Sequence, residues 1–188
     1  MKLYRAILAG MLLSLAAGYS AQAAGISGTQ ALAAVVNSPY GDVQTQASFT
    51  LNPTLVFGAS TGDFVGYPQP DSLGLVTITR ASLDSFTFGN ATFGTFTTNP
   101  GQAIEIASPD GTATFKFGGL FTPGSAFTGL DPAAAEVLVN LTQVGGHFTA
   151  ISFSGTLSIV PEPSSAVLAG IGLASLGMLR PLRKRFGR

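Results

Sequence analysis

The sequence predicts an all-β domain, an antiparallel β-sandwich or jelly-roll-like fold, flanked by an N-terminal signal helix and a C-terminal transmembrane helix. Apolar and polar residues alternate along several short runs, which is the period of half-buried strands. The 24 glycines and 11 prolines of the chain repeatedly interrupt those runs. The chain has no cysteine, so burial of apolar side chains, 14 phenylalanines among them, must stabilise the domain.

The first 23 residues have the pattern of a secretory signal peptide. Lys2 and Arg5 give a positive start, and residues 6–17 are apolar. Ala21 and Ala23 fit the small-x-small cleavage rule, so we expect cleavage after Ala23. The alternative is a buried N-terminal helix of the domain. Such a helix does not require this order of positive charge, apolar run and small residues, whereas a signal peptide does.

Residues 24–159 are expected to form a β-rich extracytoplasmic domain. Residues 28–45 are either a loosely ordered lead-in or a first edge strand, and further strands are expected at 46–57 and 75–80. Asp131 followed by proline has the form of a helix start, so one helical turn is expected over 131–136.

Three hairpins are predicted in this domain, because runs of strand character flank turns rich in Gly, Asn or Pro. They join 85–88 to 91–97 through Gly89-Asn90, 103–107 to 112–117 through residues 108–111, and 137–142 to 151–159 through Gly145-Gly146. In the last strand Ile151, Phe153, Leu157 and Ile159 share one face, which we expect to face the core.

Residues 160–188 contain three consecutive signals: a Pro-Glu-Pro motif over 160–163, an uncharged apolar run over 164–179 and a basic tail over 180–188. The motif residues are Pro161, Glu162 and Pro163, and the basic residues are Arg180, Arg183, Lys184, Arg185 and Arg188. The apolar run is slightly shorter than the ~20 residues of a usual spanning helix. A plain membrane anchor, a core helix and an interfacial amphipathic helix are the alternatives for it.

This order of motif, apolar segment and basic tail resembles the PEP-CTERM sorting signal of Gram-negative bacteria. The resemblance covers residues 160–188, and the short apolar run and Pro181 depart from the pattern. It implies that an exosortase, a membrane-embedded cysteine protease or transpeptidase, processes the chain near the motif. Members of this family are commonly linked to exopolysaccharide and biofilm production, so the resemblance also implies extracellular polysaccharide as a partner.

The distribution of charge agrees with export. Between Gly25 and Val160 only Arg80 and Lys116 are basic, against eight acids, which leaves this segment at −6. No positive cluster is available there for a nucleic acid. Basic residues tend to stay on the cytoplasmic side, so both chain ends are expected inside and the domain outside. We therefore expect the export machinery to leave the chain anchored in the inner membrane, before it reaches the cell surface or the exterior.

No catalytic, metal or cofactor site is predicted. His147 is the single histidine, and no Gly-x-Ser-x-Gly elbow is present. The acids are scattered along the chain, mostly beside turns. They are interpreted as solvated turn residues rather than as a catalytic carboxylate pair, as for Asp42, Asp63, Asp71 and Asp110.

The sequence thus favours a non-enzymatic exported protein that acts structurally or by adhesion. A carbohydrate-binding module on a β-sandwich is the alternative, although the chain has no tryptophan and only four tyrosines. A small hydrolase with two catalytic acids is the third hypothesis.

Overall fold

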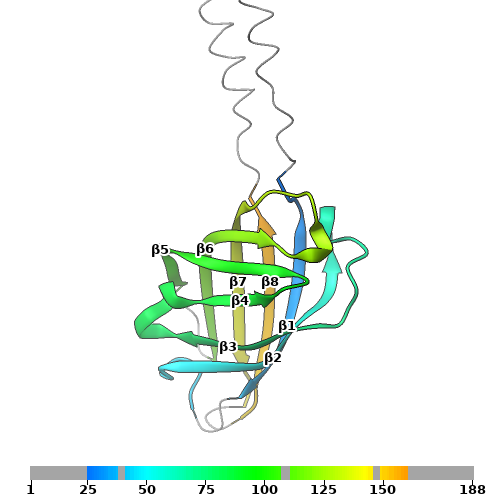
Figure 1. Cartoon of the computed structure of the whole chain (residues 1–188). Coiled ribbons are helices and arrows are strands. Elements are labelled where there is room, and N and C mark those ends of the chain that lie inside the picture. Colours follow the sequence, from blue (N-terminus) through cyan, green and yellow to red (C-terminus); the bar gives the residue numbers. More distant parts are fainter. Residues whose placement is uncertain (1–24, 38–40, 107–110, 146–148, 161–188) are drawn as a thin grey trace, which may run out of the picture.

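The computed structural model describes residues 25–37, 41–106, 111–145 and 149–160. They form an all-β domain in which eight antiparallel strands make one nearly closed, barrel-like sheet (Figure 1). The strands are β1 (Thr29–Asn37), β2 (Ser48–Ser60), β3 (Asp71–Thr79), β4 (Thr87–Asn90), β5 (Gly94–Ile106), β6 (Thr112–Pro123), β7 (Ala133–Gln143) and β8 (Ile151–Ile159). Three short 3₁₀ helices lie between them, η1 (Gly62–Phe64), η2 (Arg80–Ser85) and η3 (Ser125–Phe127).

The strand order is β3-β2-β1-β8-β7-β6-β5-β4. Strands that follow one another in the sequence are therefore neighbours, and the first strand pairs with the last. The exception is β3 and β4, which form the two ends of the sheet, with η2 between them in the chain. This is an up-and-down order with a seam between β3 and β4, and a nearly closed sheet leaves few exposed strand edges.

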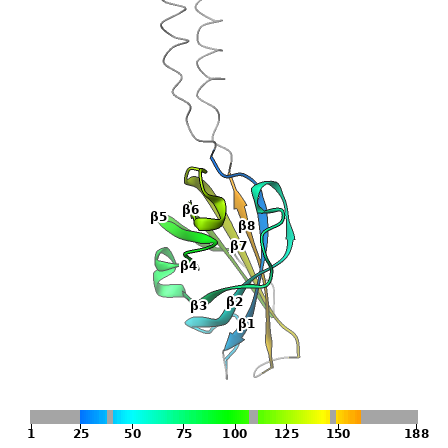
Figure 2. The same cartoon turned by 45° about the vertical axis from the view of Figure 1, so that its right-hand side comes forward.

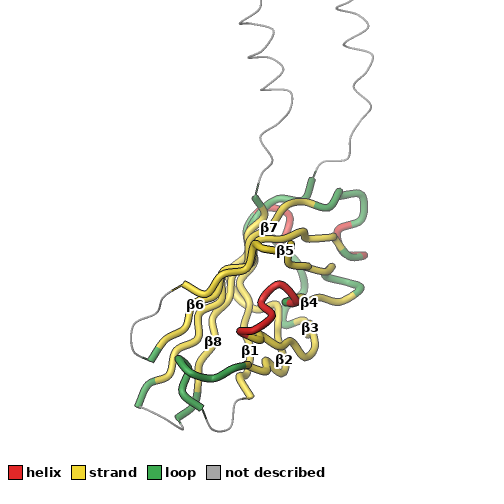
Figure 3. The backbone as a smooth tube through the Cα atoms, turned by 90° about the vertical axis from the view of Figure 1, so that its left-hand side faces the viewer, coloured by secondary structure: helices red, strands yellow, loops and turns green. Residues whose placement is uncertain are grey.

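All-β structure and antiparallel pairing are confirmed, but the two sheets of a sandwich or jelly roll are replaced by one continuous sheet. The ladder between β1 and β8 is short, covering only Thr29–Leu32 on β1. Beyond it the two strands diverge toward the end of the barrel opposite the chain ends (Figure 3). The β1–β2 connection fills the interior there with Val43, which is fully buried.

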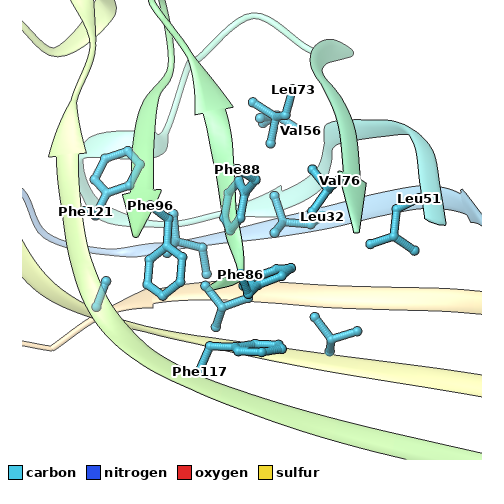
Figure 4. Close-up of a cluster of buried hydrophobic side chains, with 14 of the residues drawn as sticks. Leu32, Leu51, Val56, Leu73, Val76, Phe86, Phe88, Phe96, Phe117 and Phe121 are labelled. Atoms are coloured by element: carbon cyan, nitrogen blue, oxygen red, sulfur yellow. The ribbon is translucent and has the colours of Figure 1, made fainter. Parts of the chain in front are cut away.

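The interior of the barrel is lined by aromatic and aliphatic side chains from all the strands. Phe86 and Phe117 stack with ring centroids 4.0 Å apart, and Phe88 stacks on Phe96 at 5.5 Å (Figure 4). The expected inner face of the last strand is confirmed, because Ile151, Leu157 and Ile159 are buried and Phe153 packs against the core. The chain thus places most of its phenylalanines where they exclude water.

The hairpin predicted to turn at Gly89-Asn90 has its turn a few residues later. Both residues belong to β4, and Asn90 pairs with Gly94 across the turn. The Asn90 side chain shapes this turn, because its Oδ1 accepts hydrogen bonds from the backbone N–H groups of Thr92 and Phe93 at 2.9 and 2.7 Å. The Gly-Asn pair predicts the turn itself, whereas in the structure Asn90 starts the turn through its side chain.

The helical turn expected over 131–136 is wrong, since β7 begins at Ala133. Ala133 and Ala135 are both buried and lie directly opposite Phe121 and Gly119 of β6. The small alanine side chains fit beside the phenylalanine rings of the interior. This packing outweighs the intrinsic preference of alanine for a helix.

The other expected strands form with shifted ends. The segment expected to be a lead-in or an edge strand contains β1, which lies between β2 and β8 rather than at an edge. The pairings of 103–106 with 114–117 and of 137–142 with 152–157 are confirmed. Their turns fall partly outside the described residues.

Both ends of the described chain lie at the same end of the barrel (Figures 1 and 2). The N–H of Ile159 donates to the carbonyl oxygen of Gly28 at 2.9 Å, and that of Val160 donates to Ala134 at 2.8 Å. The predicted signal peptide and the segment after Val160 lie outside the described residues. In the ranges that the structure describes, no helix has the length and apolar character needed to span a bilayer.

Candidate functional site

Two polar networks join distant parts of the barrel. The seam network consists of Tyr67, Asp71, Ser72 and Asn90, and it connects the two ends of the sheet. The basal network lies at the end of the barrel that is farthest from Gly25 and Val160. Its side chains are those of Arg80, Glu105 and Gln143.

In the seam network, Asn90 of β4 reaches across to β3. Its Nδ2 donates to Oδ2 of Asp71 and to the carbonyl oxygen of Ser72, both at 2.9 Å. The hydroxyl of Tyr67 donates to the same oxygen of Asp71. Because β3 and β4 are the two ends of the strand order, these side-chain bonds close a gap that the strand ladders leave.

The protonation states of the seam network are well separated. The hydrogen bond from Tyr67 lowers the pKa of Asp71, burial partly opposes this shift, and the bonds from Asn90 and the Ser72 N–H add to it. Burial raises the pKa of Tyr67, and its hydrogen bond to Asp71 raises it further. At neutral pH Asp71 is therefore ionised and Tyr67 remains a donor.

We expect Asp71→Asn to lower the free energy of unfolding by about 1–2 kcal/mol at pH 7, because two donors lose a charged acceptor. The pKa of Asp71 is lower in the folded than in the unfolded chain. The stabilisation by ionised Asp71 is therefore complete above its pKa in the unfolded chain, which is about 3.9. It is lost as the pH falls through the lower pKa of Asp71 in the folded chain. Denaturant unfolding at several pH values measures this dependence. A variant with the same acid dependence as the parent would contradict the assignment.

The basal network is centred on Arg80, the first residue of η2. Its guanidinium lies over the rings of Phe49 and Phe115, at 5.3 and 5.7 Å from their centroids. Nε donates to Oε2 of Glu105 at 2.9 Å, and Nη2 donates to Oε1 at 2.7 Å. The guanidinium also donates to two backbone carbonyl oxygens of the β1–β2 connection, those of Val43 and Gln46.

Gln143, at the end of β7, completes this end of the barrel. Its Oε1 accepts from the N–H of Val43 at 2.9 Å, and its Nε2 donates to the carbonyl oxygens of Gly41 and Thr149 at 3.0 and 3.1 Å. Its own N–H donates to the carbonyl oxygen of Gly111 at 2.7 Å. One buried residue thus holds three connections, β1–β2, β5–β6 and β7–β8.

Hydrogen bonds and ion pairs occupy the charged side chains of both networks. Lys116, the other base of the domain, pairs with Glu136 at 2.5 Å on the outer face of β6 and β7. Across the ranges that the structure describes, no three His, Cys, Asp or Glu side chains gather to hold a metal ion. The hydrogen bonds of the two networks join strands and connections that are remote in sequence.

The acids interpreted as turn residues have different roles. Asp42 is a turn residue as expected, because its carbonyl oxygen accepts from the N–H groups of Thr45 and Gln46. Asp63 accepts from the N–H and hydroxyl of Ser27 at 2.7 and 2.9 Å, which fastens the start of the described chain. For Asp71 the interpretation as a solvated turn residue is wrong, because it begins β3 and joins it to β4.

Several predicted site residues lie outside the described residues. They are Ala21, Ala23, Asp110, His147, Pro161, Glu162, Pro163 and the basic residues of the tail.

Tyr67, Arg80, Asn90 and Gln143 were not among the predicted site residues. A usable signal existed for Arg80, since an arginine isolated in an acidic, phenylalanine-rich domain needs an acidic partner wherever it is buried. Asn90 and Gln143 gave no such signal, because the partners that each of them joins across the barrel are remote in sequence, Asp71 and Ser72 for Asn90 and Gly41 and Val43 for Gln143.

Comparison of the chain with protein-family models, with curated proteins and with solved structures gave no match.

Proposed function

We propose that this chain is an exported, non-enzymatic surface or extracellular-matrix protein whose C-terminus is a sorting and anchoring signal processed by an exosortase. The observation that carries the proposal is the order of signals over 160–188, a Pro-Glu-Pro motif, an apolar run and a basic tail. A signal peptide over 1–23 at the other end of the chain completes the pattern. The setting implied by the resemblance is exopolysaccharide or biofilm production.

The geometry of the barrel supports this proposal in two ways. The start of β1 and the end of β8 lie at one end of the barrel, so the two predicted terminal signals are joined to the domain at the same end. The backbone bond of Val160 to Ala134 is made directly before Pro161. Cleavage after this position would remove no residue of the eight strands, because β8 ends at Ile159.

The interior and the networks support a structural role for the domain. The charged side chains of the two networks are used to close the barrel. Tyr67, one of the two tyrosines beyond the signal peptide, is only 8% exposed, so its ring cannot stack on a sugar. Tyr67 therefore does not support the carbohydrate-binding alternative.

The proposal predicts two cleavages of the mature protein. In cells with an active exosortase, intact mass should show a chain that begins after Ala23 and lacks the basic tail. Glu162→Ala should leave the C-terminal segment uncut, whereas Glu136→Gln, a change on the outer face of the barrel, should be processed like the parent. Recovery of the parent protein with its tail intact beside an active exosortase would contradict the proposal.

A further inference from the structure

A group of hydrogen bonds holds the start of β1 and the end of β8 together. We call its residues, Ser27, Gly28, Thr61, Asp63 and Ile159, the terminal clamp. At η1, Oδ2 of Asp63 accepts from the N–H and the hydroxyl of Ser27, at 2.7 and 2.9 Å. The N–H of Asp63 in turn donates to the carbonyl oxygen of Ser27 at 2.9 Å. These bonds fasten the residues before β1 to the connection between β2 and β3.

Gly28 connects this anchorage to the last strand. A Cβ built on Gly28, whose φ is +119°, would lie 2.1 Å from the carbonyl oxygen of Thr61, so only glycine allows this approach. Thr61 also binds the next residue, since its N–H donates to Thr29 and its Oγ1 accepts from Thr29, both at 2.9 Å. On the other side, the carbonyl oxygen of Gly28 accepts from the N–H of Ile159 at 2.9 Å. Movement of β1 away from η1 therefore weakens a bond that holds the end of β8.

The end of β8 is bonded on both of its sides. Ile159 is buried, and it pairs with Ala135 of β7 while its N–H donates to the residue before β1. The N–H of Val160 donates to Ala134, and Pro161 follows directly in the sequence. An extended peptide is bound through its own free backbone groups. While these bonds are made, the backbone before Pro161 is therefore not free to pair with an enzyme.

We propose that the terminal clamp controls how fast the C-terminal segment is processed, because the sorting enzyme takes up residues on both sides of Pro161. The end of β8 must then detach before each cleavage. Asp63 is a positioning residue in this step, since it acts on β8 through the start of β1. Both Thr61 and Asp63 are exposed, which makes detachment a local opening at the surface. This inference rests on the sorting function proposed above.

Amide hydrogen exchange of the full chain in detergent micelles, followed by mass spectrometry, tests the first step. Asp63→Ala removes the acceptor of two hydrogen bonds, so exchange at the end of β8 should become about tenfold faster. Exchange of β4, a short end strand that opens without the clamp, should be unchanged. Asp42→Ala is the matched control, because that carboxylate accepts from the N–H of Gln44 at the opposite end of the barrel.

Processing in cells with an active exosortase tests the second step. When opening is fast and reversible, cleavage follows the population of the open form, so Asp63→Ala should be cut about tenfold faster in a pulse-chase. Asp42→Ala should be cut at the parent rate. Inserting Gly-Ser-Gly-Ser between Val160 and Pro161 supplies free backbone before the motif. The inserted chain should be cut faster than the parent, and adding Asp63→Ala to it should have no further effect.

Three results would overturn the inference. They are unchanged exchange at the end of β8 in Asp63→Ala, unchanged processing of that variant, and an inserted chain that still responds to Asp63→Ala. Cleavage of the parent and the inserted chain at one rate also contradicts the clamp, and it leaves the sorting proposal intact. If neither chain is cut, the sorting proposal itself fails and this inference fails with it. Thermal melting of each variant verifies that the barrel still folds.

Discussion

Replacing Phe117 by alanine should lower the free energy of unfolding by about 4 kcal/mol, the largest effect expected of a single substitution in this domain. Phe117 is fully buried on β6 and stacks on Phe86 at 4.0 Å. Its ring supports the segment leading into β4, a strand of only four residues. The loss therefore combines the transfer of an aromatic side chain with a cavity that the surrounding sheet cannot readily collapse to fill.

Denaturant unfolding of the parent and variant chains measures this loss as a fall in the transition midpoint. Phe57→Ala is the matched control, because it removes the same ring from a site that is 55% exposed, and it should cost less than about 1 kcal/mol. Equal costs at the two positions would show that the interior of the barrel is not packed as described.

Replacing Arg80 by alanine should lower the free energy of unfolding by about 3 kcal/mol, or the melting temperature by roughly 10 °C. The variant leaves the carboxylate of Glu105 and the carbonyl oxygens of Val43 and Gln46 without their donor. It also removes the cation that covers the ring of Phe49. The side chains of Arg80 and Glu105 are 18% and 34% exposed, which keeps the expected cost at the lower end of that for buried pairs.

The second base of the domain is a control within the same chain. Lys116 and Glu136 are 41% and 37% exposed, so Lys116→Ala should change the free energy of unfolding by less than about 1 kcal/mol. Thermal melting of both variants compares the two ion pairs directly. If Lys116→Ala proved as costly as Arg80→Ala, the carbonyl and ring contacts of Arg80 would not be the source of its effect.

The strands of this barrel were predictable wherever one face is buried and the other is polar. The alternation of Ile151, Leu157 and Ile159 with serine and threonine is a local signal, and it correctly assigned the inner face of β8. The hairpins follow equally from short-range pattern. Ala133 and Ala135 could not be assigned to a strand, because their burial depends on Phe121 and Gly119, which β6 brings opposite them.

The closure of the sheet and the two networks depend on contacts between residues far apart in sequence. Gln143 and Val43 are separated by 100 positions, and Asn90 and Asp71 by 19. Nothing local distinguishes an asparagine that shapes a turn from one that also bridges two strands. Sandwich and barrel share the same strand pattern, so the short ladder between β1 and β8, which joins everything into one sheet, could not be inferred from the sequence.

That ladder also determines when the domain can be completed. A ribosome makes β1 first and β8 last, so Thr29–Leu32 must wait for most of the domain to be synthesised before their partner strand exists. Until then β1 and β7 each present an unpaired edge, while the intervening hairpins can already form from local contacts. A nascent or truncated chain that stops before Ile151 therefore has two more open edges than the complete sheet and is prone to pair with other chains. Because β8 is synthesised last, its pairing with β1 is the step that converts an aggregation-prone intermediate into the complete domain.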